Sequence, residues 1–358
     1  MRRSAILACS LTVTLLALAQ AQPGGLSDTV KYRTKDGAEK TSFGELKETP
    51  AGIVITSNGK TVATIAPHDV IAVYYGKMAG VDGQVRQELP QWDAKGGLEA
   101  RNKYADLLKT ASGAGADERT KRFLEFRVAV LSAKVADTKT GEEFKTEAAA
   151  AIDKLTTVAR SYTKSWEAYP AARHAARLQA EIGKYSDAAT TLATVAKIDG
   201  LPPELKGEAK LGEVDALFRS GSALSAAPAI EELGKSAATL TNAQKDRLNV
   251  FQAALKGAQD KTEPAKVNAA AVAVRTLVDK MTDPVARAGA HNTLGELFFM
   301  ANMTRDAMWE YLWVEAVYNQ DKEEVIKALD RLATIFEKLG EKDRAAVYRE
   351  KLLKAKAG

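Results

Sequence analysis

The sequence predicts a mainly α protein, in which a superhelix of α-α hairpins follows a small antiparallel β module of five strands. Three observations support this fold class. Residues 28–76 alternate between polar and apolar and are rich in β-branched side chains, with hairpin turns between the runs. From Leu98 onward, apolar residues recur at helical spacing. Within that helical part, one pattern of small and large residues returns about every 40 residues.

Residues 1–21 have the features of a secretory signal peptide. Arg2 and Arg3 precede an apolar run, Ser4 to Ala19, that is too short to span a membrane, and Ala19-Gln20-Ala21 is a small-x-small cleavage site. We therefore expect export to the periplasm or the extracellular side, with an uncleaved N-terminal anchor as the alternative. Cys9, the only cysteine, would leave with the signal, so the mature chain would form no disulfide.

The charge balance argues against a polyanionic partner. The formal net charge is +5, and without Arg2 and Arg3 the chain holds 49 basic and 46 acidic residues. Charges of both signs are interleaved along most segments, which is typical of a solvated surface. We expect no nucleic-acid partner, and no membrane span in the mature chain because no later apolar run is long enough.

The β module is predicted over residues 27–76. Strands are expected at 28–34, 39–48, 52–57, 60–66 and 70–75, and Asp36-Gly37 and Asn58-Gly59 are strong hairpin signals because both residues of such a turn tolerate positive φ. A small barrel or a rolled sheet would leave few exposed edges. The pattern G-I-x-I-x-x-x-G-K, ending in D-V-I-x-V-x-Y-G at Gly76, resembles small β modules at the start of secreted bacterial repeat proteins.

A linker is expected over residues 77–97. Its glycines, Pro90 and the break in periodicity are typical of a domain boundary. Trp92 is positioned to hold the β module and the helices together. The helical-repeat domain is predicted over residues 98–358.

The helical repeat has a fixed register around each turn. A small residue lies seven positions before the turn, an alanine five after it, and larger residues nine and twelve after it. The register is clearest around Gly183, Asn302 and Gly340, and weaker around Gly221 and Asp260. Glycine and asparagine tolerate the left-handed φ of a turn, and the small residues suit a close helix crossing. With a longer first unit turning at Gly141, the sequence predicts six helical hairpins.

The copy around Asn302 resembles a tetratricopeptide repeat. His291-x₂-Leu294-Gly295-x₂-Phe298 is similar to W-x₂-L-G-x₂-Y, and Ala307-x₃-Tyr311 to A-x₃-F. The chain departs from that family in having histidine at 291, no proline near Asn319 and a period nearer 40 than 34 residues. Over residues 165–358, the resemblance implies a superhelix whose first helices line a concave groove for peptides or partner domains.

That resemblance also implies which residues face the groove. Transferred copy by copy, they are Arg173, Arg177, Asp215, Asn292, Glu296, Phe299, Asp330 and Thr334. The functional interpretation is a polar groove that binds a protein or peptide partner. The alternative is an ordinary solvated helix face, or ordinary core for Phe299.

The second helix of that copy is apolar nearly all round. After Ala307, only Glu310 and Glu315 interrupt a run that holds Trp309 and Trp313. Such a helix is expected to be buried on both sides, between the preceding hairpin and the final one, 321–356. If the tryptophans were exposed instead, they would mark a partner-binding surface.

No catalytic or metal-binding constellation is present in the sequence. Asn58-Gly59-Lys60-Thr61 lacks the first glycine of a phosphate-binding loop, and the S-x-x-K at Ser161 follows the K-T-G at Lys139, the reverse of the order in penicillin-binding enzymes. His68, His174 and His291 lie far apart and lack ligand-spaced partners. We expect no catalytic residues, no metal and no cofactor.

The functional prediction is an exported, non-enzymatic interaction or scaffold protein of the cell envelope, with its partner in the superhelical groove. One alternative makes the β module a ligand-binding head and the repeats a spacer or an oligomerisation arm. A hydrolase with an unrecognised site is the third. The sequence leaves the partner, the curvature of the superhelix and the oligomeric state open.

Overall fold

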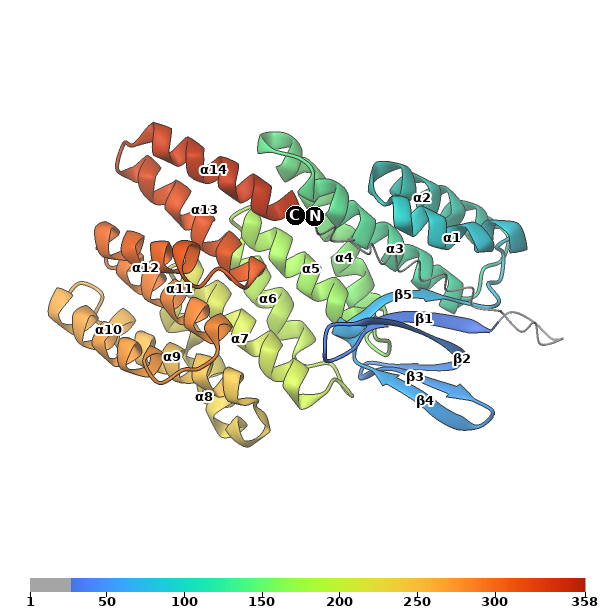
Figure 1. Cartoon of the computed structure of the whole chain (residues 1–358), viewed down its shortest axis with the longest axis horizontal. Coiled ribbons are helices and arrows are strands. Elements are labelled where there is room, and N and C mark those ends of the chain that lie inside the picture. The colour runs from blue at the N-terminus through green and yellow to red at the C-terminus, as the bar shows by residue number, and fades with distance from the viewer. Residues whose placement is uncertain (1–26, 358) are drawn as a thin grey trace, which may run out of the picture.

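The computed structural model describes residues 27–357, and the predicted signal peptide lies outside this range. Within it, five strands are followed by fourteen α-helices, most of them paired in antiparallel hairpins (Figure 1). The predicted fold class is confirmed. None of the helices in these residues combines the length and the apolar character needed to cross a membrane.

The β module is one antiparallel sheet with strand order β4-β3-β2-β1-β5. A 3₁₀ turn, η1 (Pro67–Asp69), connects the two outermost strands, β4 and β5. All five predicted strands are present, and each boundary lies within one residue of its expected position. The strands are β1 (Asp28–Arg33), β2 (Glu39–Thr49), β3 (Gly52–Ser57), β4 (Lys60–Ile65) and β5 (Val70–Tyr74).

The long strand β2 allows the sheet to roll. Its first half pairs with β1 as far as Gly44, and its second half pairs with β3 from Glu45 onward. Gly44 has φ +157°, and a Cβ atom there would lie 2.3 Å from the carbonyl oxygen of Thr56. Only glycine allows strand β3 to come this close. The rolled module lies against the helices (Figure 1), and its buried Val30, Ile53 and Val73 pack on them.

The segment 77–97 is not the open linker that we expected. Residues Gly83–Lys95 form helix α1, capped by the Asp82 side chain, and Pro90 lies inside the helix. Trp92 on α1 is buried and packs edge-on against Tyr104 of α2 (Gly97–Gly113), with ring centroids 5.4 Å apart. The sequence hid this helix because glycines flank it on both sides and its apolar face is short.

Six hairpins follow, as the repeat register predicts. Gly141, Gly183, Gly221, Asn302 and Gly340 all have positive φ, whereas Asp260 ends its helix at φ −116°. The helix pairs are α3 (Glu118–Asp137) with α4 (Gly141–Ser161), α5 (Ala168–Glu181) with α6 (Tyr185–Val195), α7 (Pro203–Arg219) with α8 (Ala227–Lys235), α9 (Asn242–Gln259) with α10 (Pro264–Val278), α11 (Pro284–Met300) with α12 (Thr304–Ala316), and α13 (Lys322–Lys338) with α14 (Lys342–Ala357).

The small residues of the register lie where paired helices cross. Gly295 on α11 faces the ring of Tyr311 on α12, and a Cβ atom at this glycine would lie 2.5 Å from the ring. Ala307 and Tyr311 are fully buried. The close approach explains why the register combines a small residue before each turn with a larger one nine positions after it.

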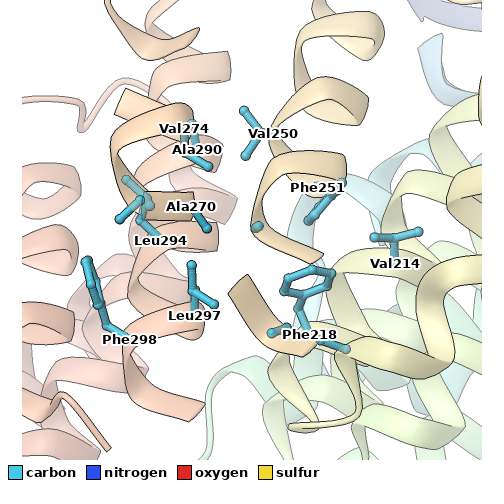
Figure 2. Close-up of a cluster of buried hydrophobic side chains, with 14 of the residues drawn as sticks. Val214, Phe218, Val250, Phe251, Ala270, Val274, Ala290, Leu294, Leu297 and Phe298 are labelled. Atoms are coloured by element: carbon cyan, nitrogen blue, oxygen red, sulfur yellow. The ribbon is translucent and has the colours of Figure 1, made fainter. Parts of the chain in front are cut away.

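Two large cores hold the molecule together. One is built from α7 to α14, and Figure 2 shows part of it, with Phe218 and Phe251 in contact across two hairpins. The other joins the β module to α1–α5, so that Val30, Ile53 and Val73 share one cluster with Tyr104 and Phe123. The β module therefore packs on the helices as part of one structural unit.

A buried polar junction fixes this contact. Glu48 of β2 accepts hydrogen bonds from Tyr75, at 2.6 Å, and from Trp166, at 3.1 Å. Arg122 of α3 bridges Glu48, at 2.7 Å, and the fully buried Glu167, at 2.9 Å. Pairing and hydrogen bonding satisfy charges that would be costly to bury alone.

The superhelix closes on itself. Lys356, near the end of α14, lies 2.8 Å from Glu181 of α5, and its ammonium group lies over the ring of Phe144 on α4. Helix α13 crosses the inner face of the earlier repeats, where Lys327 pairs with Asp215 of α7. Figure 1 shows the C-terminus beside α5. The first helices therefore surround a partly filled interior.

Candidate functional site

The residues predicted to line the groove are held by contacts within the chain. Glu296 of α11 accepts two hydrogen bonds, of 2.7 and 2.9 Å, from the Arg331 guanidinium of α13. Asn292 donates to the Glu324 side chain, at 2.7 Å, and to its backbone carbonyl, at 3.0 Å. Helix α13 thus occupies this part of the interior.

The predicted residues on α5 and α7 lie at the other end of the same interior. Arg173 is 3.4 Å from Glu208 and 3.3 Å from Glu323, so it connects α5 to both α7 and α13. Arg177 makes two 2.9 Å hydrogen bonds to Asp137 of α3. Each guanidinium is thus already neutralised by carboxylates of the chain.

The last three predicted residues lie within α13 and at the end of α11. Asp330 accepts a hydrogen bond from Arg219, at 3.1 Å, and the hydroxyl of Thr334 donates to the Asp330 carbonyl, at 3.0 Å. Phe299 is half-buried beneath the Arg331 guanidinium, 5.1 Å from its ring centroid. None of these contacts tests partner binding, which stays a prediction for all eight residues.

Helix α12 differs from our expectation. Trp309 is 61 % exposed and Trp313 49 %, so the predicted burial on both sides is wrong. The buried residues Ala307, Tyr311 and Val314 face the neighbouring helices, and one face stays uncovered. Trp309, Trp313 and Val317 recur every fourth residue and form a stripe, which we call the α12 face. The sequence shows a helix apolar all round, but only the three-dimensional arrangement shows which side is left open.

A buried charge network supports the α12 face from below. Glu310, only 3 % exposed, accepts hydrogen bonds from Arg275 of α10 and is bonded to His291 Nδ1 of α11, at 2.7 Å. The His291 ring stacks on Trp313 and on Tyr318, with centroid distances of 6.0 and 5.1 Å. The network fixes the orientation of these rings.

The Glu310 carboxylate is ionised in this setting. Burial alone would raise the pKa of Glu310, but the hydrogen bonds from His291 and Arg275 outweigh it and lower the pKa. The charge therefore remains in place under the α12 face at neutral pH. Sequence reasoning identified His291 only as a departure from the repeat motif, and no local signal pointed to Glu310 as its partner.

The structure brings His68 and His174 to the walls of one cavity and places His291 elsewhere. His68 lies in the β module, His174 on α5 and His291 on α11, and residues 27–357 contain no cluster of three or more side chains suited to holding a metal ion.

Comparisons with known proteins find little beyond the fold. No protein-family model matches the chain, and no curated protein is similar to it. Among solved structures, a tetratricopeptide repeat protein from Parabacteroides merdae is similar. It shares 14 % sequence identity, covers 77 % of this chain and 98 % of its own, and gives a TM-score of 0.45.

Proposed function

We propose that this chain is an exported, non-enzymatic scaffold protein that holds a protein partner in the cell envelope. The observation that carries the proposal is the α12 face, where two tryptophans are exposed on an ordered helix. Tryptophan is strongly enriched among residues that dominate binding energies at protein interfaces. The signal-peptide pattern of residues 1–21 supports export.

Preorganisation makes this face suited to binding. Trp313 is held by stacking on His291, so little side-chain entropy is lost when a partner covers it. Val272, on the neighbouring helix α10, is 60 % exposed and extends the apolar surface. Arg275 of the same helix lies beside it and is half exposed. The matching partner surface is an apolar patch.

The groove predicted from the tetratricopeptide resemblance is a weaker location for a large partner. Helix α13 already fills much of it, and a partner domain would have to displace ion pairs such as Arg331 to Glu296. Breaking one side of a buried ion pair costs about 3–5 kcal/mol. We therefore place the protein partner on the outer α12 face.

A second candidate is the β module as a binding head. Phe43 on β2 is 59 % exposed and Val62 on β4 is 52 % exposed, so the sheet also presents apolar side chains to solvent. The two candidates make opposite predictions for the same partner. One requires Trp309 for binding, and the other requires Phe43, which is almost equally exposed.

The experiment compares matched variants in binding to envelope extract. Trp309→Ser with Trp313→Ser should abolish capture of the partner seen with the unmodified protein, whereas Phe43→Ser should leave it unchanged. Loss on Phe43→Ser alone would favour the β module instead. Capture that neither change alters would contradict both surfaces.

A further inference from the structure

A cavity of about 620 Å³ remains where the superhelix meets the β module. Its walls come from η1 and β5 on one side and from α3, α5, α7 and α13 on the others. Helix α13 forms one wall of the cavity, so the cavity is not part of a continuous groove along the superhelix. Its volume lies within the range of about 300–1,000 Å³ that is usual for small-molecule sites.

The charges that line the cavity are unbalanced. Its five carboxylates are all paired with cations: Glu208 and Glu323 with Arg173, Asp215 and Glu324 with Lys327, and Glu181 with Arg177 and Lys356. Of its eight lysines and arginines, Arg33, Lys134 and Arg247 make no ion pair within residues 27–357. The surplus charge is positive, so the cavity favours an anion.

His174 lies in the α5 wall of the cavity. Burial and the nearby Arg177, Arg173 and Lys134 together lower the pKa of His174 to about 4. Arg173 and Arg177 are paired with carboxylates, whereas Lys134 makes no ion pair within residues 27–357. An anion placed here would meet the Lys134 ammonium and an imidazole that is free to donate a hydrogen bond.

Apart from His68 of η1 and the tyrosine of α5, the rest of the lining is mainly apolar. Val70 and Ile71 of β5, with Phe126 and Val130 of α3, form a hydrocarbon surface beside the cations. Tyr169 is 1 % exposed, and its hydroxyl lies beside the Glu208 carboxylate.

We propose that this cavity binds a small organic acid, with its carboxylate beside Lys134 and His174 and its apolar body against β5 and α3. This site is separate from the α12 face and does not depend on it. The β module contributes one wall, so binding requires the module and the repeats together.

The charge preference is tested with three probes that share one apolar body. Octanoate, octan-1-ol and octylammonium are titrated into the purified protein by calorimetry. Octanoate should bind about tenfold more tightly than either of the others, since a hydrogen bond to a charged group is worth about 1.4 kcal/mol or more. Equal affinities, or no octanoate binding up to millimolar concentration, would overturn the proposal.

Lys134→Gln tests the position of the carboxylate. It removes a cation that makes no ion pair within the described chain, so the fold should be retained, and octanoate affinity should fall about tenfold. Lys154→Gln, an equal charge change on the exposed side of α4, should leave the affinity unchanged. Ile71→Glu, which places a negative charge on the half-buried β5 wall, should also weaken binding. Unchanged affinity in Lys134→Gln and Ile71→Glu would refute the site.

A titration with peptides distinguishes a small organic acid from the C-terminus of a protein as the ligand. An acetylated apolar tetrapeptide is titrated in its acid and amide forms. Weaker binding of the peptide acid than of octanoate supports the small-molecule site. Tighter binding of the peptide acid would replace our proposal with recognition of a peptide C-terminus.

Discussion

At the scale of single residues, the close crossing of α11 and α12 requires a residue without a side chain at Gly295. Gly295→Ala should lower the free energy of unfolding by about 1–3 kcal/mol, because its Cβ would meet the Tyr311 ring at 2.5 Å. Gly289→Ala on the same helix is the control, since its Cβ would have no neighbour closer than 3.8 Å. Alanine there should stabilise the helix by about 0.5–1 kcal/mol. Urea denaturation measures both, and equal effects would contradict the account.

His174 gives a pH-dependent prediction. Its pKa of about 4 in the folded protein, set by burial and by Arg177, Arg173 and Lys134, lies below the ordinary value of 6.5. The unfolded chain therefore binds the extra proton first as the pH falls. The stability from a neutral His174 is full above pH 6.5 and decreases toward pH 4, by at most about 3 kcal/mol.

The measurement is urea denaturation at pH 7.5 and 5.0 for the unmodified protein and for His174→Gln. Because glutamine does not titrate, the variant should lose less stability between the two pH values. Identical losses would show that His174 is not held neutral by its cationic neighbours.

At the scale of elements, helix α12 shows where the sequence was informative and where it was not. The turn at Asn302 and the presence of a helix after it followed from the repeat register, because helix formation and left-handed φ are local properties. Which face stays open depends on the path of α13, and that path is set by ion pairs between residues far apart in sequence. Helix α1 was missed for a related reason, since tertiary packing of Trp92 stabilises a segment with weak local signals.

The two tryptophans of α12 should differ in their effect on stability. Trp309→Ser should change the free energy of unfolding by no more than about 0.5 kcal/mol, because its side chain is mostly in solvent. Trp313→Ser should cost about 0.5–1.5 kcal/mol more, since it also loses the stack on His291. Thermal denaturation of the two variants checks this. A larger loss for Trp309→Ser would mean that this face is covered.

At the scale of the whole molecule, the interior ion pairs hold the superhelix closed. Arg331→Met should destabilise the protein by up to about 3–5 kcal/mol, because Glu296 would stay buried with only the longer, 3.8 Å contact to Arg219. Adding Glu296→Gln, which removes the stranded charge, should restore part of that loss. Denaturation of the single and double variants measures the coupling, and purely additive effects would contradict it.

The β module and the helices should unfold together. They share one apolar core, and Glu48 joins them through Arg122 and Trp166. Calorimetry should give a single transition for this part of the chain, and Glu48→Ala should lower its midpoint. A separate, low-temperature transition of the β module would contradict a shared core. The sequence predicted the strands of this module and left its close association with α3 and α5 open, because the contacts join distant residues.

Site-specific photocrosslinking tests the central claim, that the α12 face binds a protein partner in the cell envelope, most directly. A photoreactive amino acid is placed at position 309, 313 or 43, and adducts formed in intact cells are identified by mass spectrometry. The account predicts one partner crosslinked from positions 309 and 313 and absent from 43. That partner, once purified, should bind the unmodified protein and fail to bind the variant with Trp309→Ser and Trp313→Ser. No adduct from the α12 face, or equal binding of the purified partner to that variant, would contradict the account.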